Sequence, residues 1–194
     1  MSRIKEVSKR VIEVYESKNP NRDDWADWLY KKHVFIVAEE AKQLSDRLDA
    51  KEDLAAVAGL LHDIADALMS RFNSKHEEES FVIARNILQD SGFSKEEIKI
   101  VVDDAMKFHS CRDGQIPASL EGKVMATADA IIHIKTDFYK IALDLMRKEG
   151  RNPEKSKEWA LEKLERDFHD KILFDDVRKE LVSEYKKLKI FLKD

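Results

Sequence analysis

Apolar residues recur at three- and four-residue spacing along most of this chain, and this period limits its fold more than any other feature. The stretches 2–17, 153–169 and 175–192 all follow it. That spacing is typical of amphipathic helices, and no segment alternates as a half-buried strand would. Only 5 Gly and 3 Pro interrupt the 194 residues. We therefore expect an all-α protein, folded as one helical domain over 1–194.

Helix-start signals divide the chain into segments. Asp23 or Asp24 is expected to cap a helix that runs to Leu48, and Asn152 with Pro153 is expected to begin a later one. Three Ser or Asp residues followed three positions later by Glu predict capping boxes. These pairs are Asp49 with Glu52, Ser74 with Glu77 and Ser94 with Glu97. The helices so predicted include Leu54–Leu68, 75–90, 95–109 and 119–148.

Composition excludes some classes of partner and indicates a compartment. The formal net charge is −4, so no bulk attraction to a nucleic acid polymer or an anionic membrane is expected. The only cysteine is Cys111, which excludes an internal disulfide and a cysteine-based zinc site. The longest apolar stretch, Leu54–Leu61, is too short to span a bilayer. We therefore expect a cytoplasmic location.

Ionisable residues interrupt the apolar faces of several predicted helices. They are His33, the pair His62-Asp63, and Asp129. Imidazole and carboxylate ligands together suit Mn, Fe, Co, Ni or Zn. Four such ligands would leave open positions, as catalytic sites do and structural zinc sites do not. The alternative is that each is a buried polar residue that is simply hydrogen-bonded to its surroundings.

The arrangement His33…His62-Asp63…Asp129 resembles the HD superfamily of metal-dependent phosphohydrolases. The phrase AAVAGLLHDIAD is similar to its defining helix, and VMATADAI to the segment that holds its last aspartate. The resemblance covers about 25–140 and implies an HD-type helical bundle, with 150–194 as C-terminal accessory helices. It implies that His33, His62, Asp63 and Asp129 bind a divalent transition metal. It also implies hydrolysis of a small phosphorylated substrate such as a nucleotide, whether ester or anhydride.

His76 and His109 decide between one metal ion and two. Some branches of the superfamily use two further histidines to hold a second ion, and SKHEEESFVIARNIL and AMKFHS resemble those segments. In the alternative, His76 is a solvated first-turn residue and His109 interacts with a helix C-terminus. Both alternatives stay open, with one or two ions.

Departures from the superfamily's branches prevent a finer assignment. The branch that reads HDxGK has a lysine, whereas this chain has Ala65 and Asp66 after Ile64. Another branch has Asp two residues before its last ligand, where Thr127 stands here. These differences keep open a second interpretation, a non-catalytic nucleotide-binding or sensor module.

The remaining site predictions concern catalysis, substrate and self-association. Asp66 joins Asp63 as a catalytic candidate, either as general base or as a residue that orients His62. Arg112, Lys107 and His133 are the substrate-binding candidates, and His133 alternatively belongs to a network with Asp129 four residues earlier. The apolar face of 175–192 predicts a homodimer contact if the chain itself does not cover it.

Overall fold

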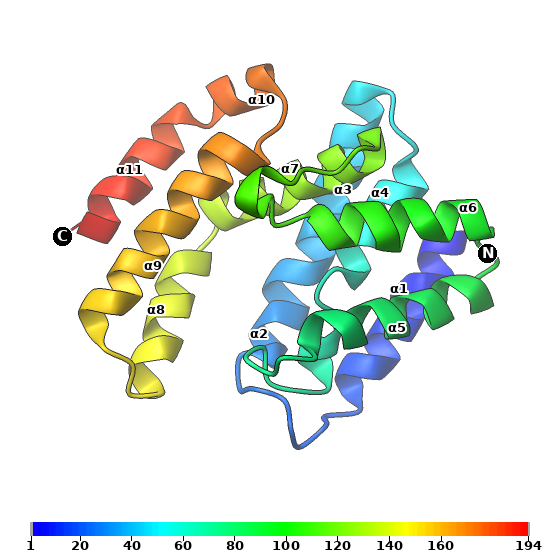
Figure 1. The fold of residues 1–194 in the computed structure, drawn as a ribbon, viewed down its shortest axis with the longest axis horizontal. Helices are drawn as coiled ribbons and strands as arrows, with labels where there is room; N and C mark the ends of the chain where they lie inside the picture. Colours follow the sequence, from blue (N-terminus) through cyan, green and yellow to red (C-terminus); the bar gives the residue numbers. More distant parts are fainter. Residues whose placement is uncertain (1, 194) are drawn as a thin grey trace.

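The computed structural model describes residues 2–193, and every regular element among them is a helix (Figure 1). The first part of the chain forms α1 (Arg3–Glu16), α2 (Ala26–Leu29), η1 (Tyr30–Val34), α3 (Phe35–Leu48), α4 (Glu52–Leu61), η2 (Ile64–Ala67), α5 (His76–Asp90), α6 (Lys95–Ile98), η3 (Lys99–Met106), η4 (Arg112–Gly114) and α7 (Leu120–Lys135). The rest forms α8 (Phe138–Lys148), α9 (Pro153–Arg166), η5 (Asp167–Lys171), α10 (Asp175–Glu180) and α11 (Val182–Lys193). The expectation of an all-α protein is confirmed.

Three helices at the centre position the rest of the bundle. The helices α3, α4 and α7 pack against one another, and α1 packs against α4. Gly59 allows α4 to approach α3 closely, because any other residue would place its Cβ atom only 3.1 Å from the Ala38 Cα. The buried apolar residues form two clusters, one under α1, α4 and η3, and the other between α7 and the C-terminal helices.

The C-terminal helices cover one side of α7. Figure 1 shows α8, α9 and α11 together on one side of the molecule and α1, α5 and α6 on the other, with α7 between them. The segment η5 packs against both α7 and α9. Most of the apolar stripe on 175–192 is buried within the chain, although Ile190 is 62% and Phe191 52% exposed. The homodimer stays a prediction.

Two predicted helix starts are confirmed. Ser94 and Glu97 form the capping box at α6, in which each side chain accepts a hydrogen bond from the other's backbone N–H. The Asn152 side chain accepts from the Lys155 N–H at 3.0 Å, and Pro153 opens α9.

The other predicted caps are wrong, and two of these residues are used elsewhere in the fold. Asp49 ends α3 in the left-handed conformation, with φ of 59°, instead of starting α4. Asp23 accepts hydrogen bonds from the Ser70 hydroxyl at 3.1 Å and the Arg71 N–H at 2.9 Å, which ties down a distant loop. The α5 helix starts at His76 with no side-chain cap.

Three predicted helices are broken where the sequence has neither Gly nor Pro, and one of these breaks, at Leu181, divides the predicted helix 175–192 into α10 and α11. The predicted helix Leu54–Leu68 ends at Leu61, and Asp63 leaves helical geometry with φ of −129° and ψ of 34° before η2 begins. The predicted helix 119–148 is interrupted at Thr136, whose backbone is extended between α7 and α8. The break after Leu61 places the His62-Asp63 pair at the end of a helix. No helix among residues 2–193 combines the length and apolarity that crossing a membrane requires.

Candidate metal centre and pocket

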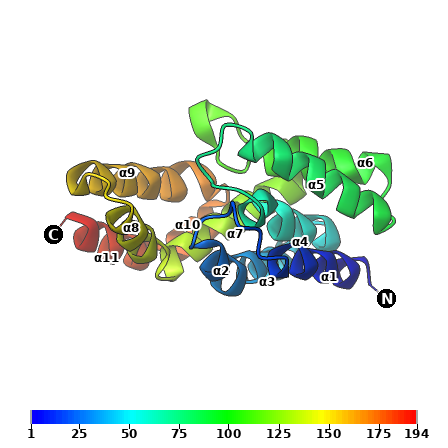
Figure 2. The ribbon, with the colours of Figure 1, turned by 90° about the horizontal axis from the view of Figure 1, so that it is seen from below.

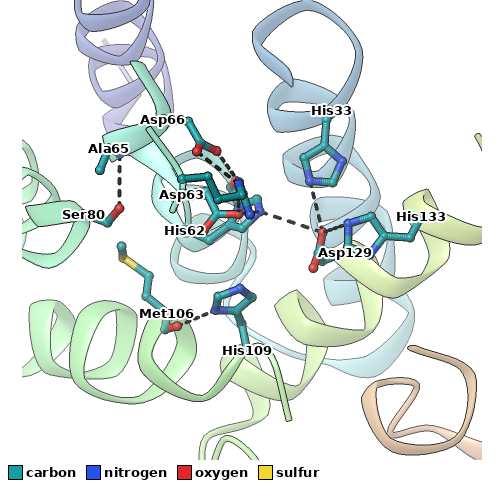
Figure 3. A network of polar contacts seen from close by, with 12 residues as sticks. His33, His62, Asp63, Ala65, Asp66, Ser80, Met106, His109, Asp129 and His133 are labelled. Atoms are coloured by element: carbon teal, nitrogen blue, oxygen red, sulfur yellow. Dashed lines mark hydrogen bonds and ion pairs between the residues drawn. The ribbon is translucent and has the colours of Figure 1, made fainter. Parts of the chain in front are cut away.

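Three of the four predicted ligands converge at the centre of the molecule. His33 comes from η1, His62 from the end of α4, and Asp129 from the middle of α7 (Figure 3). Each is at most 3% exposed. One ligand atom from each of the three can be chosen so that all lie within 4.8 Å of one another. Since η1 is π-helical, His33 stands at a local widening of the helix, a feature frequent at functional sites.

The Asp129 carboxylate lies where the imidazoles meet. Its Oδ1 atom is 3.2 Å from His33 Nε2 and 3.8 Å from His62 Nε2. Figure 3 shows the rings of His33 and His133 both directed at this carboxylate. Burial works against the charge of Asp129, but His133 and Lys171 beside it hold its pKa well below the ordinary value. Asp129 is therefore an anion at neutral pH.

The orientation of His62 fits a metal ligand. Its Nδ1–H donates to the Gly59 carbonyl oxygen at 2.8 Å, which leaves the Nε2 lone pair facing the cluster in the neutral imidazole. His62 Nε2 and Asp129 Oδ1 are buried, and neither makes a hydrogen bond with any residue from 2 to 193. Unpartnered buried polar atoms are costly and rare. A divalent cation among them would satisfy both, so the residues present fit the metal that the sequence predicts.

His133 also belongs to this buried cluster, which forms the floor of the pocket described below. Its ring stacks on His33 with centroids 5.1 Å apart, and its Nε2 lies 3.2 Å from Asp129 Oδ1. Its Nδ1–H donates to Asp167 Oδ2 at 3.0 Å, and burial lowers the pKa of His133 to about 3. The network with Asp129, which the sequence offered as the alternative, is what the structure shows. His133 has the orientation of a further metal-facing histidine.

Asp63, the fourth predicted ligand, is shared with an arginine. Its Oδ2 lies 3.5 Å from His62 Nε2, and Arg71 Nη2 donates to the same oxygen at 2.7 Å. Burial would raise the pKa of Asp63, but Arg71 and then His62 hold it well below the ordinary value. Arg71 lies in the loop after η2, and the sequence analysis did not identify it. Arg71 follows Asp63 by eight residues and Asp66 by five, and neither separation is the three- or four-residue step that pairs side chains on a helix.

Asp66 does not orient His62, contrary to one of its two predicted roles. It is 1% exposed, and its carboxylate accepts from Arg71 and from His76 Nε2, the latter at 2.9 Å. His62 is oriented by a backbone carbonyl instead. Asp66 is also absent from the residues that line the pocket, so its contacts favour a positioning role for Arg71 and His76 over that of a general base.

The two additional histidines occupy different environments. His76 is buried against Asp66 rather than solvated, although it also lines the pocket. His109 donates from Nδ1 to the Met106 carbonyl oxygen at 2.6 Å, which is the helix-end contact expected of a C-terminal histidine. Its ring nevertheless faces His62 with centroids 5.4 Å apart (Figure 3). A role for either residue toward a second ion stays a prediction.

Behind Asp129 lies a buried charge network that sequence reasoning missed. Lys171 is 2% exposed, and its Nζ donates to Asp129 Oδ2 at 2.5 Å. Asp167, which is fully buried, accepts from the Tyr139 hydroxyl at 2.5 Å and from Lys163 at 3.1 Å. Lys171 and Asp167 both belong to η5, so the C-terminal segment takes part in holding the metal-site carboxylate. The signal available was the position of Lys171 between the apolar residues Phe168 and Ile172.

A pocket of about 730 Å³ opens above this floor. His33, Asp63, Asp129 and His133 contribute to its lining, and so does Arg112, one of the predicted phosphate contacts. Lys107 does not line the pocket: it is an exposed residue directly after η3, and its Nζ lies over the ring of Phe108. The prediction that Lys107 contacts substrate is therefore not supported by its position.

Comparison with known proteins agrees with this geometry. The HD domain family matches residues 30–133, which holds all four predicted ligands. The crystal structure of selenomethionine-labelled YpgQ from Bacillus subtilis has a similar fold, with a TM-score of 0.70, 21% identity, and coverage of 99% of this chain and 95% of that one. No curated protein matches closely enough to count as a relative. Because the family match spans more than half of the sequence, the chain belongs to the HD domain family of metal-dependent phosphohydrolases.

Proposed function

We propose that this protein hydrolyses the phosphate ester or anhydride of a small nucleotide or a related phosphorylated molecule. The observation that carries the proposal is the pair of buried, unpartnered atoms His62 Nε2 and Asp129 Oδ1, 3.8 Å apart, where Asp129 also lines a pocket of about 730 Å³. His33, His62 and Asp129 would hold a divalent transition metal, joined by Asp63. When bound, such a cation supplies Lewis-acid polarisation of a phosphoryl oxygen and makes water a stronger nucleophile near neutral pH.

The residues around the predicted metal site orient its ligands and provide contacts for a substrate. The Gly59 carbonyl fixes the tautomer of His62, and Arg71 holds Asp63 in place. Burial lowers the pKa of His109 to about 4, so this histidine is neutral at pH 7. With its Nδ1–H donated to Met106, it presents Nε2 as a hydrogen-bond acceptor for water or substrate. Trp25, Phe138 and Trp159 give the pocket aromatic faces that suit a base.

Metal analysis combined with phosphate release tests this function. Protein purified without chelator or a metal-binding tag is expected to contain about one or two transition-metal ions per chain and to release phosphate or pyrophosphate from a panel of nucleotides. His62→Ala and Asp63→Asn should each lose metal and activity while keeping the helical circular dichroism spectrum. His169→Ala and Asp170→Asn change exposed residues and should alter neither.

A sensor or binding module is the second candidate, and the Asp63–Arg71 ion pair favours it because Arg71 engages a carboxylate oxygen of one of the four predicted metal ligands. This alternative predicts that metal and nucleotide raise the melting temperature with no turnover of any nucleotide in the panel. Retained activity in both site variants would contradict the metal-dependent assignment. A cytoplasmic location fits a small phosphorylated substrate and is part of the same proposal.

A further inference from the structure

One long wall of the pocket is a face of α9. Lys155, Trp159 and Lys163 line it at steps of four residues, which places them on one side of the helix. Arg166 continues this face, and Arg151 precedes it in the loop before α9. Figure 2 shows α9 and α5 at the same level of the molecule, α9 toward the end that holds the C-terminus and α5 toward the end that holds the N-terminus. This wall lies outside residues 30–133, the part that matches the HD family.

The charge of the pocket is opposite to that of the chain. The lining includes three acidic residues, namely Asp63, Glu77 and Asp129. It includes seven basic ones, namely Arg71, Arg112, Arg151, Lys155, Lys163, Arg166 and Lys171. The whole chain has a net charge of −4. A basic pocket in an acidic protein attracts anions to that site alone.

Four of the seven cations already have partners. Arg71 binds Asp63 and Asp66, and Lys171 binds Asp129. Lys163 binds Asp167, and Arg151 binds Glu149 while its guanidinium lies 3.8 Å over the ring of Phe72. These cations are committed to holding side chains and loops in place.

The other three cations have no such partner. Arg112, Lys155 and Arg166 form no ion pair with a carboxylate among residues 2–193, at a limit of 4.0 Å. Arg166 Nε is in addition buried without a hydrogen-bond partner in that part of the chain. A buried charged donor left unpaired is costly, and an anionic oxygen from a ligand would satisfy it.

We propose that Lys155 and Arg166 on α9, together with Arg112 of η4 in the same pocket lining, bind the part of the substrate beyond the phosphate at the metal floor. Lys155 and Arg166 are eleven positions apart, which is roughly 16 Å along a helix. Positive charge therefore runs along the pocket instead of gathering at one point, and the ligand that fits is a linear polyanion, a chain of linked phosphates. This inference rests on the proposed function, in which the floor of the pocket holds a metal ion and binds one phosphate of the substrate.

Binding of inorganic tripolyphosphate in the presence of chelator tests the wall without any contribution from metal or turnover. The protein is expected to bind tripolyphosphate at least about ten times more tightly than orthophosphate, because several charge-assisted contacts form together. Lys155→Gln and Arg166→Gln should each weaken tripolyphosphate binding by roughly three- to tenfold, measured by isothermal titration calorimetry. Circular dichroism establishes that both variants are folded.

Lys157→Gln is the matched control. Lys157 lies two residues from Lys155 on the same helix, but it does not line the pocket. If Lys157→Gln weakens binding as much as Lys155→Gln does, the attraction is general to α9 and the proposed wall is wrong. Equal affinity for tripolyphosphate and orthophosphate would also overturn it.

The experiments distinguish an error in the proposed phosphate-binding wall from an error in the proposed function. A protein that hydrolyses nucleotides but binds tripolyphosphate independently of Lys155 and Arg166 retains its function and refutes the wall. A protein that binds tripolyphosphate through these residues, yet hydrolyses nothing with any transition metal, supports the wall and refutes the function.

Discussion

Lys171 determines which oxygen of Asp129 is available to a cation. Its ammonium group binds Oδ2, whereas Oδ1 faces His33, His62 and His133 without a hydrogen bond. Burial lowers the pKa of Lys171, but Asp129 and then Asp167 more than compensate, so its pKa is raised and the lysine stays charged. The carboxylate of Asp129, a predicted metal ligand, is thus held in one orientation by a residue 42 positions later in the chain.

Removing that ammonium should expose how much the buried carboxylates depend on positive charge. Lys171→Met is expected to lower the free energy of unfolding by about 3–5 kcal/mol in chelator, because it leaves Asp129 buried with one charge partner fewer. A divalent cation at the site replaces part of the lost charge, so Mn²⁺ should stabilise the variant more than the wild type. Urea unfolding with and without Mn²⁺ measures both effects.

The comparison for this variant is Lys148→Met, at an exposed position in the last turn of α8. That change should cost less than about 1 kcal/mol, with no altered response to metal. If Lys171→Met behaves like Lys148→Met, then Lys171 does not govern Asp129.

The sequence alone singled out three residues that the fold brings together, but not those that hold them in place. His33, His62 and Asp129 were recognisable because ionisable groups interrupt helical apolar stripes in a family pattern. Arg71 and Lys171 were not recognisable, because what places them is tertiary packing between segments far apart in sequence. The many other Lys and Arg residues of the chain resemble them until the fold buries some of them.

At the scale of elements, the close contact of α4 with α3 sets the position of His62. Gly59 lies one turn before His62, and its carbonyl oxygen fixes the tautomer of that histidine. A Cβ atom at Gly59 would lie 3.1 Å from Ala38 Cα and 3.2 Å from Ala38 N, and neither backbone atom can move aside as a side chain would.

Gly59→Ala should therefore push α4 away from α3. We expect it to lower the free energy of unfolding by about 1–3 kcal/mol, the usual cost of overpacking a core, even though alanine favours helix. The displaced helix end should also lower the metal content per chain. Urea unfolding and elemental analysis measure the two effects, and a variant as stable as the wild type would show that the helices separate without strain.

Helix interruptions were the part of the fold that the sequence did not predict. The breaks after Leu61 and at Thr136 contain no Gly or Pro, and the local pattern of apolar residues continues through both. In the first, the side chains of His62 and Asp63 contact different partners, the Gly59 carbonyl and Arg71. Contacts of this kind are formed only in the folded molecule, so single-sequence periodicity cannot indicate them.

For the whole molecule, the buried ionisable groups predict a loss of stability in acid. Burial lowers the pKa of His133 to about 3 and of His109 to about 4, and both bind a proton near pH 6.5 when the chain is unfolded. Between these limits the unfolded state takes up protons that the folded state does not. Stability is therefore complete above pH 6.5 and falls as the pH decreases, by up to roughly 1.4 kcal/mol per pH unit for each histidine.

Asp63 and Asp129 add to this loss at lower pH, because their folded pKa values lie below those of the unfolded chain. Urea unfolding of the metal-free protein at pH 7.5, 6 and 5 measures the slope. His109→Gln should make the dependence shallower. A stability that is constant from pH 7.5 to 5 would show that these histidines are accessible to protons in the folded state.

The floor and the wall of the pocket come from different stretches of the chain, one within 30–133 and the other within 151–171. Because of this division, the ligand that the pocket recognises can change without a change in the floor residues. Under the proposed function, substitutions along α9 would alter what is recognised while the predicted metal ligands keep their places, and loss of a floor histidine would leave a protein that binds its ligand without hydrolysing it. Related chains with the same floor residues and a different α9 would then differ in substrate specificity before they differ in the reaction they catalyse.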